Sequence, residues 1–373
     1  MKAIVKGAKA PTFLFGMLTV AISILNLKQQ SFFTPTDIES WLPDFFALQD
    51  CLKAPGSISG CSALSKFPLA YLGVSAVLSV TSKLNIGIPL ATFLLNLIFS
   101  LLALVLLVPL SPNLRNGSSL VKVCITLFLT PLPWFYFQSG AIEYQSGLFL
   151  ILISTSFGYL VRYPRVHSAT SIKQFYAVLL LLASTFFFGL YKDSQSLLLL
   201  ISLLAGLLLY SLFWHYRITT IWTTLVMLFG ILASITASFA YNFYRYNDFL
   251  PRDYLHEALH RSPDIQQKFF NLLGIWFSLS GGVISFWGLS IIYVTTVVGL
   301  GVFKRLEVLI TTFFFLVSSI ALAAWWSPFG WFAWGNRLII PSGMGFLFSL
   351  LLASFDSNAE ESEEPIMLTF INS

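Results

Sequence analysis

The chain has little charge and few of the residue types from which soluble active sites are built. Of its 373 residues only 10% are charged, and it has 3 Cys, 4 His and 5 Met, whereas 57% of its residues are hydrophobic. A water-soluble fold does not hide this much apolar surface, while a lipid bilayer requires it. The scarcity of charge therefore argues against an ordinary soluble protein, and the loops leave no room for a separate soluble domain.

The apolar residues gather in long runs, and nearly all the charge lies in the stretches between them. A membrane-spanning helix needs about 20 apolar residues, and helices satisfy their own backbone hydrogen bonds in lipid. The sequence therefore predicts an all-α, polytopic transmembrane helix bundle of about ten or eleven spans. The expected spans are 12–27, 68–82, 87–110, 120–138, 145–161, 174–190, 196–213, 219–240, 284–303, 308–325 and 338–354.

Three segments are predicted to lie outside the spans. Two are loops, at 28–67 and 241–283, and the third is the tail 355–373, which is rich in Asp, Glu, Ser and Asn. Such a composition is typical of disorder. Residues 1–354 are thus expected to form a single transmembrane domain that is followed by a disordered acidic tail.

The basic residues predict the orientation of the spans. Lys and Arg in short loops mark the cytoplasmic side, so the net charge of +5 reflects membrane orientation and does not indicate nucleic-acid binding. Both long loops and the stretch after Trp325 then face outward, and both termini are cytoplasmic, in a plasma (inner) membrane. Two cytoplasmic termini need an even number of crossings. The least convincing of the eleven spans, 68–82, is therefore expected to be partly re-entrant or to lie in the outer leaflet. The basic stretches are Arg115–Lys122, Arg162–Lys173, His215–Arg217 and Lys304–Arg305.

The first outer loop concentrates acids in a chain that has only 16 of them. Asp37, Glu39, Asp44 and Asp50 follow the first span within a short stretch. A carboxylate in a partly apolar cleft can serve as a general base or hold a divalent cation. The alternative is a solvated loop in which Asp37 caps a short helix. Two cysteines of the same loop, Cys51 and Cys61, either pair as a disulfide or stay free.

The second outer loop contains a match to the zinc-binding pattern H-E-x-x-H. On a helix, His256 and His260 would lie on one face, with Glu257 as the general base. A zinc protease also needs a third protein ligand, and no His follows His260, while Asp264 is too near for that role. A zinc metalloprotease is therefore a third hypothesis, and an ordinary amphipathic loop helix is its alternative.

The segment from Trp325 to Pro341 alternates Gly and Trp and ends with one Arg at the mouth of the last span. The guanidinium of Arg337 offers a fork of donors that suits a phosphate, and Trp331 and Trp334 can stack on a sugar ring. The alternative is an aromatic belt with a snorkelling Arg.

Three stretches resemble GT-C-type integral membrane glycosyltransferases, in the group of the protein mannosyltransferases and aminoarabinose transferases. Ser327 to Arg337 resembles the "W-x-G-G-x-x-x-G-P-R" segment, with Asn336 in place of Pro. Tyr241 to Asp248 with Tyr254 resembles the "N-x-x-R-F-G-x-P…G-Y" loop, and Leu273 to Gly282 resembles the "G-L-x-x-S-P-x-x-G" that follows it. Each match is degenerate.

The resemblance implies transfer of a sugar from a polyprenyl-phosphate donor to an acceptor on the non-cytoplasmic face. The catalytic acid would be Asp37, with Glu39 and Asp44 as alternatives, often together with a divalent metal ion. Arg337 would hold the donor phosphate, assisted by Arg245 and Lys192. The remaining roles are sugar or acceptor contacts for Trp331, Trp334 and Tyr254, and metal binding for His256 and Glu257.

Two other functions stay open on the sequence alone. A transporter or flippase of a lipid-linked or small polar substrate would carry internal repeats and ionisable residues near the membrane midplane. The chain shows no convincing repeat, and its ionisable residues are expected in the loops. A non-catalytic assembly protein with the same fold is the other alternative.

Overall fold

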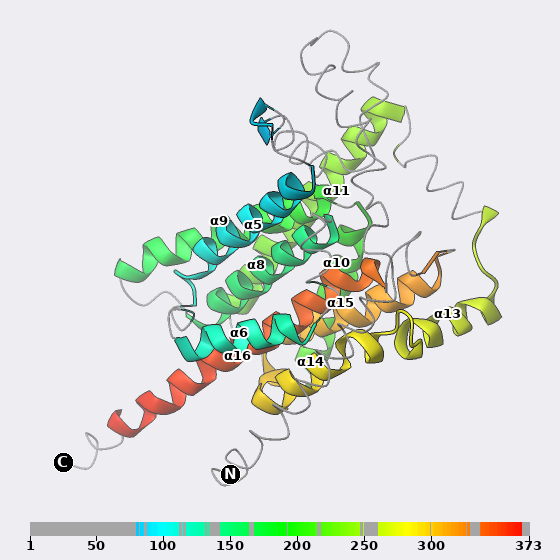
Figure 1. Cartoon of the computed structure of the whole chain (residues 1–373). Coiled ribbons are helices and arrows are strands. Elements are labelled where there is room, and N and C mark those ends of the chain that lie inside the picture. The colour runs from blue at the N-terminus through cyan, green and yellow to red at the C-terminus, as the bar shows by residue number, and fades with distance from the viewer. Residues whose placement is uncertain are drawn as a thin grey trace.

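The computed structural model is an assembly of helices (Figure 1). The part of the chain that it describes contains helices and turns but no strand. The predicted first span and first outer loop lie outside this part. It comprises residues 80–81, 83–85, 88–111, 114, 117–130, 133, 142–163, 168–191, 193–214, 218–246, 249, 260–298, 300–325, 327–328 and 336–367.

The helices follow the apolar runs of the sequence. They are α5 (Ile88–Leu107), α6 (Gly117–Phe128), α8 (Ile142–Arg162), α9 (Ser168–Tyr191), α10 (Asp193–Phe213), α11 (Ile218–Tyr246), α13 (Ile265–Phe277), α14 (Val283–Val298), α15 (Leu306–Ala323) and α16 (Ile340–Met367). Two short 3-10 helices, η3 (Leu300–Lys304) and η4 (Arg337–Ile339), precede α15 and α16.

Six helical segments in the described residues are long and apolar enough to cross a membrane, which confirms the prediction of a helical membrane protein. These segments are Ile142–Arg162, Ile172–Tyr191, Gln195–Phe213, Ile218–Phe243, Leu306–Ala323 and Arg337–Phe355. Shorter apolar helices at Leu94–Leu107, Gly117–Leu127 and Val283–Val298 accompany them.

Two of the spans, α8 and α16, form the centre of the bundle. Their apolar windows are 89% and 94% buried, against 28% for α10 and 33% for α11. Glycines allow the two central helices to approach closely: a Cβ on Gly147 would lie 2.8 Å from Met344 Sδ, and one on Gly345 would lie 2.2 Å from Leu150 Cδ2. The peripheral helices expose large apolar side chains, as lipid-facing helices do.

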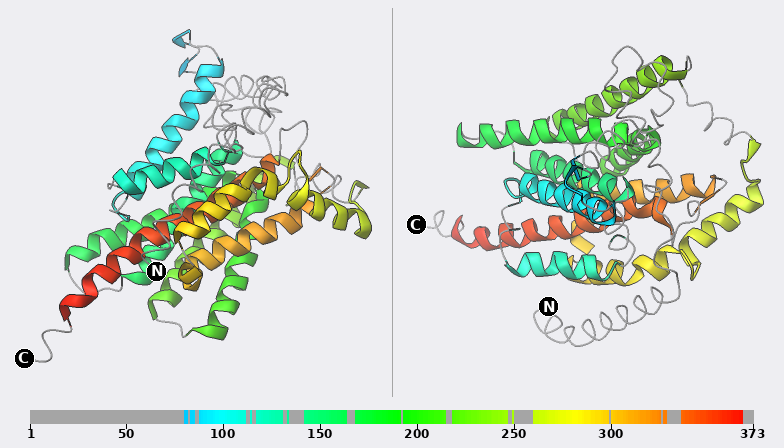
Figure 2. Two further views of the ribbon diagram at one scale, coloured as in Figure 1. Left: turned by 60° about the horizontal axis from the view of Figure 1, so that its bottom comes forward. Right: turned by 45° about the horizontal axis from the view of Figure 1, so that its top comes forward.

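Contacts along α8 show how the helix ends are grouped. At its first residues α8 meets Tyr191 at the end of α9 and Arg337 before α16. At its last turn it meets Glu307 at the start of α15. We call these the Glu143 end and the Arg162 end of the bundle. The last helix, α16, runs toward the Arg162 end, and its red end projects from the bundle in Figures 1 and 2.

The grouping agrees with the alternation that the basic loops predict, for the residues described. The start of α8, the end of α9, the end of α15 and the start of α16 share the Glu143 end, where the sequence analysis expects the outer loops. Which side of a membrane each end faces remains a prediction.

One of the expected spans differs from the structure. The span expected at 120–138 is a 12-residue helix, α6, that ends at Phe128. Two prolines follow closely, at 131 and 133, and a proline removes a backbone donor and disfavours helix in the residue before it. At about 1.5 Å per residue α6 is too short to span a bilayer.

Two segments predicted to lie outside the spans contain helix in the structure. The predicted loop 241–283 contains the last turns of α11 and the whole of α13. Likewise α16 continues to Met367, where the sequence analysis expects a disordered tail. The residues Asn358 to Glu364 include Ala and several Glu, which favour helix once a preceding span has nucleated it.

Candidate functional site

Most of the predicted site residues lie outside the described part of the chain. Arg337 is described with its side chain, and Arg245 is placed only as a backbone position in the last turns of α11. The roles predicted for the others stay predictions: Asp37, Glu39, Asp44, Lys192, Tyr254, His256, Glu257, Trp331 and Trp334.

Arg337 opens η4 at the Glu143 end, where the chain enters the last span. Its side chain is only 14% exposed, and its Nε lies 4.0 Å from Oε1 of Glu143, whose side chain is 8% exposed. This separation brings two opposite charges together without forming a short hydrogen bond. The guanidinium is thus largely removed from water, with a carboxylate close by.

Asn336 precedes Arg337 and is also buried. It is 1% exposed, and neither its Oδ1 nor its Nδ2 has a hydrogen-bond partner in the structure. It occupies the cap position of η4, but its side chain makes no capping bond. A buried amide with both polar atoms unsatisfied costs free energy unless a ligand or a water molecule completes it.

The first turn of α8 supplies most of the remaining polar groups. Residues 142–146 are all buried, and four of them carry polar side chains: Glu143, Tyr144, Gln145 and Ser146. The Oγ of Ser146 has no hydrogen-bond partner, and that residue is 0% exposed. Polar groups this well buried at the end of a membrane span are typical of a functional site.

These polar groups occupy two faces of α8. At about 100° per residue Glu143 and Gln145 point in nearly opposite directions, so the first faces α16 and the second faces α5 and α9. Ser146 lies about 60° from Glu143 on the helix. The group on the α16 side, consisting of Glu143, Ser146, Asn336 and Arg337, is the candidate site.

The polar residues on the other face form a hydrogen-bonded network. The Nε2 of Gln145 donates to Oδ1 of Asn96 over 2.7 Å, and the hydroxyl of Tyr191 donates to Oε1 of Gln145. Tyr144 shares a 2.9 Å hydrogen bond with Ser100. Because these side chains satisfy one another across α5, α8 and α9, this network fixes the helix start that carries Glu143.

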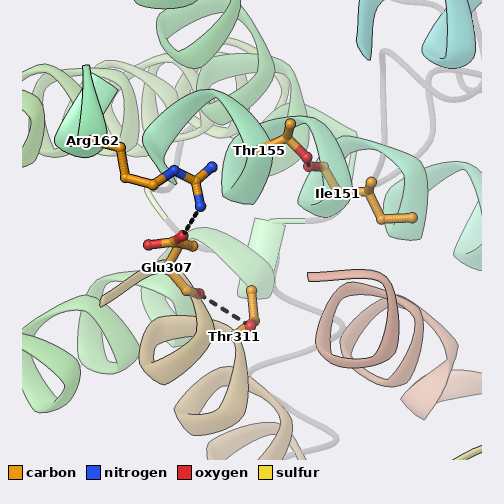
Figure 3. Close-up of polar contacts among 5 residues, drawn as sticks. All are labelled: Ile151, Thr155, Arg162, Glu307 and Thr311. Carbon is orange, nitrogen blue, oxygen red and sulfur yellow. Dashed lines mark hydrogen bonds and ion pairs between the residues drawn. The ribbon is translucent and has the colours of Figure 1, made fainter. Parts of the chain in front are cut away.

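The Arg162 end has an ion pair of its own (Figure 3). Nη1 of Arg162 donates to Oε1 of Glu307 over 3.0 Å, and Thr311 Oγ1 donates to the backbone oxygen of Glu307 over 3.1 Å. Gly158 lies beside this pair, since a Cβ there would be 2.7 Å from Glu307 Oε1. The sequence analysis expects the ionisable residues in loops, but Glu143, Arg162 and Glu307 lie in the terminal turns of helices. Arg337 lies at the mouth of the last span, as predicted.

The described residues do not fit a metal centre. Among them no three His, Cys, Asp or Glu side chains come together, and the carboxylate of Glu143 lies beside Arg337. Asp264, weighed above as a zinc ligand, caps α13 by accepting from the backbone N of Gln267 over 2.7 Å. His260 is exposed just before it. The metal-binding roles predicted for the first-loop acids and for His256 and Glu257 concern residues outside this set.

Sequence reasoning missed Glu143, Ser146 and the amide network. It left residues 139–144 between the expected spans 120–138 and 145–161, which removed Glu143 from consideration. The signal was present in the cluster Glu143-Tyr144-Gln145-Ser146, which opens an otherwise apolar run. An ionisable residue at the edge of a span is a functional candidate by default.

No protein-family model matches the chain, and neither a curated protein nor a solved structure matches it.

Proposed function

We propose that this chain is a membrane glycosyltransferase that takes a sugar from a polyprenyl-phosphate donor at the Glu143 end, on the non-cytoplasmic face of a plasma (inner) membrane. The observation that supports it is Arg337, a largely buried guanidinium at the mouth of a span with an unsatisfied amide beside it. The GT-C resemblance of the segment ending in Arg337 agrees with this role.

The chemistry of Arg337 suits a lipid phosphate. A guanidinium binds a phosphate through two parallel N–H donors, and such bonds are stronger where water is excluded. Asn336 offers two further amide hydrogens from Nδ2. Glu143 balances the charge of Arg337 while no phosphate is bound.

The reaction makes one bond to the sugar and breaks another. The acceptor hydroxyl attacks the anomeric carbon, the bond from that carbon to the phosphate oxygen breaks, and the hydroxyl proton passes to a carboxylate. In this proposal that carboxylate belongs to the first loop, with Asp37 ahead of Glu39 and Asp44. The polyprenyl phosphate departs with an added negative charge, which Arg337 stabilises.

Binding of the donor phosphate tests the role of Arg337. The purified protein in nanodiscs is titrated with polyprenyl phosphate, and turnover is measured with a panel of polyprenyl-phosphate sugars. Arg337→Lys keeps the charge but loses the fork of donors, so we expect binding to weaken about 10- to 100-fold. The matched control is Arg162→Lys, which makes the same exchange in the ion pair at the opposite end and should leave binding unchanged. Equal binding by all three proteins would refute the assignment.

A transporter or flippase is the second candidate, because buried ion pairs close both ends of α8. Pairs in such positions can serve as gates on either side of a central substrate site. In a transporter, variants of both pairs would abolish movement of substrate across the membrane. In a glycosyltransferase, sugar transfer is lost with Arg337 and is retained in Arg162→Lys.

A further inference from the structure

The candidate site combines one positive and one negative charge. Arg337 supplies the guanidinium and Glu143 the carboxylate, both side chains are largely buried, and Arg337 Nε lies 4.0 Å from Glu143 Oε1. The other two members, Asn336 and Ser146, are also buried and offer hydrogen bonds without charge. The four side chains together are therefore close to electrically neutral before a ligand binds.

The carboxylate of Glu143 is held in place from the opposite face of α8. Nε2 of Gln145 donates to Oδ1 of Asn96, and the hydroxyl of Tyr191 donates to Oε1 of Gln145. These hydrogen bonds join the first turn of α8 to α5 and α9, so they fix the backbone that carries Glu143. The carboxylate therefore stays beside Arg337 when a ligand reaches the guanidinium.

Two positive groups stabilise the negative charge of Glu143. The residue lies in the first turn of α8, where the unpaired backbone N–H groups of a helix favour an anion, and the guanidinium of Arg337 lies beside it. An anion bound to Arg337 thus shares that guanidinium with a fixed carboxylate. Salt screens buried charges only weakly, so Glu143 repels each negative charge that the ligand carries.

This repulsion depends on the number of charges on the ligand. A phosphodiester carries one negative charge, whereas a phosphomonoester carries two above its second pKa of about 6. Arg337 attracts both, but Glu143 repels two charges twice as strongly as one. In the proposed reaction the sugar donor is a diester. When the bond to the anomeric carbon breaks, its electron pair stays on the phosphate oxygen, and the lipid phosphate becomes a monoester.

We propose that Glu143 selects the charge of the bound phosphate and favours a phosphodiester over a phosphomonoester. The inference rests on the proposed function, in which Arg337 binds a phosphate group. Within that reaction Glu143 lowers the affinity for the released lipid phosphate more than the affinity for the sugar donor, and it thereby favours release of the product. Glu143 acts on specificity and transfers no proton.

Binding of two matched phosphates tests the proposal. Dodecyl phosphate and methyl dodecyl phosphate share one alkyl chain, and at about pH 8 they carry two charges and one charge. Each is titrated into the protein in dodecyl maltoside, a detergent without phosphate, and the ratio of the two dissociation constants is measured. We expect Glu143→Gln to strengthen binding of the monoester about tenfold more than binding of the diester. Glu143→Asp keeps the charge and should keep the ratio of the unchanged protein.

Two further variants serve as an opposite test and as a matched control. Asn336→Asp adds a carboxylate of nearly the same shape next to Arg337, so it should shift the ratio about tenfold in the other direction. Because Glu143→Gln and Asn336→Asp change the charge in opposite senses, either variant alone can decide the proposal. Glu307→Gln makes the same exchange in the ion pair at the Arg162 end and should leave the ratio unchanged.

The outcomes separate the inference from the proposed function. A ratio that stays constant in Glu143→Gln or Asn336→Asp would overturn the inference, even though both phosphates bind. If Arg337→Lys leaves binding of both phosphates unchanged, no phosphate is held at Arg337, and the proposed function fails as well. If the ratio responds, phosphatidylglycerol displaces methyl dodecyl phosphate and no polyprenyl-phosphate sugar is turned over, the site binds a phospholipid headgroup. In that case the inference stands and the proposed function fails.

Product inhibition gives a kinetic readout of the same selection. Free polyprenyl phosphate should inhibit sugar transfer by the Glu143→Gln protein at a concentration about tenfold lower, relative to the KM for the donor, than in the unchanged protein. A purely structural role of Glu143 would change the inhibition constant and the KM by the same factor. Such an equal change contradicts the inference.

Discussion

The two ion pairs at the ends of α8 are built from the same residue types and differ in almost every other respect. At one end Arg162 and Glu307 meet at 3.0 Å, with the Arg in the last turn of α8 and the Glu in the first turn of α15. Both charges complement the dipoles of their own helices. The placement of Arg162 and Glu307 is therefore the one expected of an ion pair that stabilises the bundle.

At the other end the geometry is looser and one charge is badly placed for stability. Glu143 complements the start of α8, but Arg337 lies just ahead of the start of α16, where a cation is unfavourable, and the two groups are 4.0 Å apart. A buried group kept where it does not stabilise its helix is a candidate for function. The comparison thus separates a pair whose charges suit both of its helices from a pair in which one charge does not.

The largest loss of stability should come from removing one partner of the Arg162–Glu307 pair. Glu307→Ala leaves Arg162 without its carboxylate, and breaking a buried pair in this way costs about 3–5 kcal/mol of unfolding free energy. Glu143→Ala, its counterpart, should cost clearly less because the 4.0 Å pair contributes less in the native state. Thermal unfolding of both variants in the same detergent measures the difference, and equal losses would remove the distinction between the pairs.

A smaller loss of stability is expected from replacing the glycines beside the two ion pairs with alanine. Gly158→Ala places a methyl group 2.7 Å from Glu307 Oε1, which Arg162 holds in place, and such overpacking costs about 1–3 kcal/mol. Gly147→Ala at the other end meets Met344 Sδ at 2.8 Å, and a methionine side chain adapts more easily. Apparent melting temperatures should fall further for Gly158→Ala. The reverse order would indicate that Glu307 is free to move.

The smallest loss of stability is expected from breaking the hydrogen-bonded network of Gln145, Asn96 and Tyr191, on the face of α8 opposite Glu143. Gln145→Leu removes the partner of Asn96 and Tyr191, and a hydrogen bond between membrane helices contributes about 0.6–2 kcal/mol. We expect a loss in this range together with weaker binding of polyprenyl phosphate, because the start of α8 is less fixed. Ser234→Ala, which removes the 2.6 Å hydrogen bond to Ser196, should lower stability to a similar degree without changing binding.

Sequence alone predicted the helical membrane bundle and the position of Arg337, for clear physical reasons. The length of an apolar run reports its ability to span a bilayer, and an Arg at the mouth of a span stands out in a chain with so little charge. Seven of the expected spans between 145 and 354 correspond to helices α8–α11 and α14–α16.

The contacts between side chains of different helices could not be predicted from the sequence. The order of residues in the sequence does not indicate that Arg162 pairs with Glu307, 145 positions later, or that Glu143 lies beside Arg337. These pairs depend on how the helices pack against one another. Hydropathy averages also conceal single polar residues such as Asn96 inside a strongly apolar helix. The sequence around α13 was predicted to be a loop, and the structure shows a short helix that packs against α15.

The distance between the two pairs gives α8 a further role. Glu143 and Arg162 are nineteen positions apart, so their Cα atoms are separated by about 28 Å along the helix, close to the thickness of a hydrocarbon core. In a thicker membrane a charged pair would be drawn below the headgroups, and in a thinner one apolar turns would meet water. The spacing of the two pairs therefore predicts a preference for membranes whose hydrocarbon core has about this thickness.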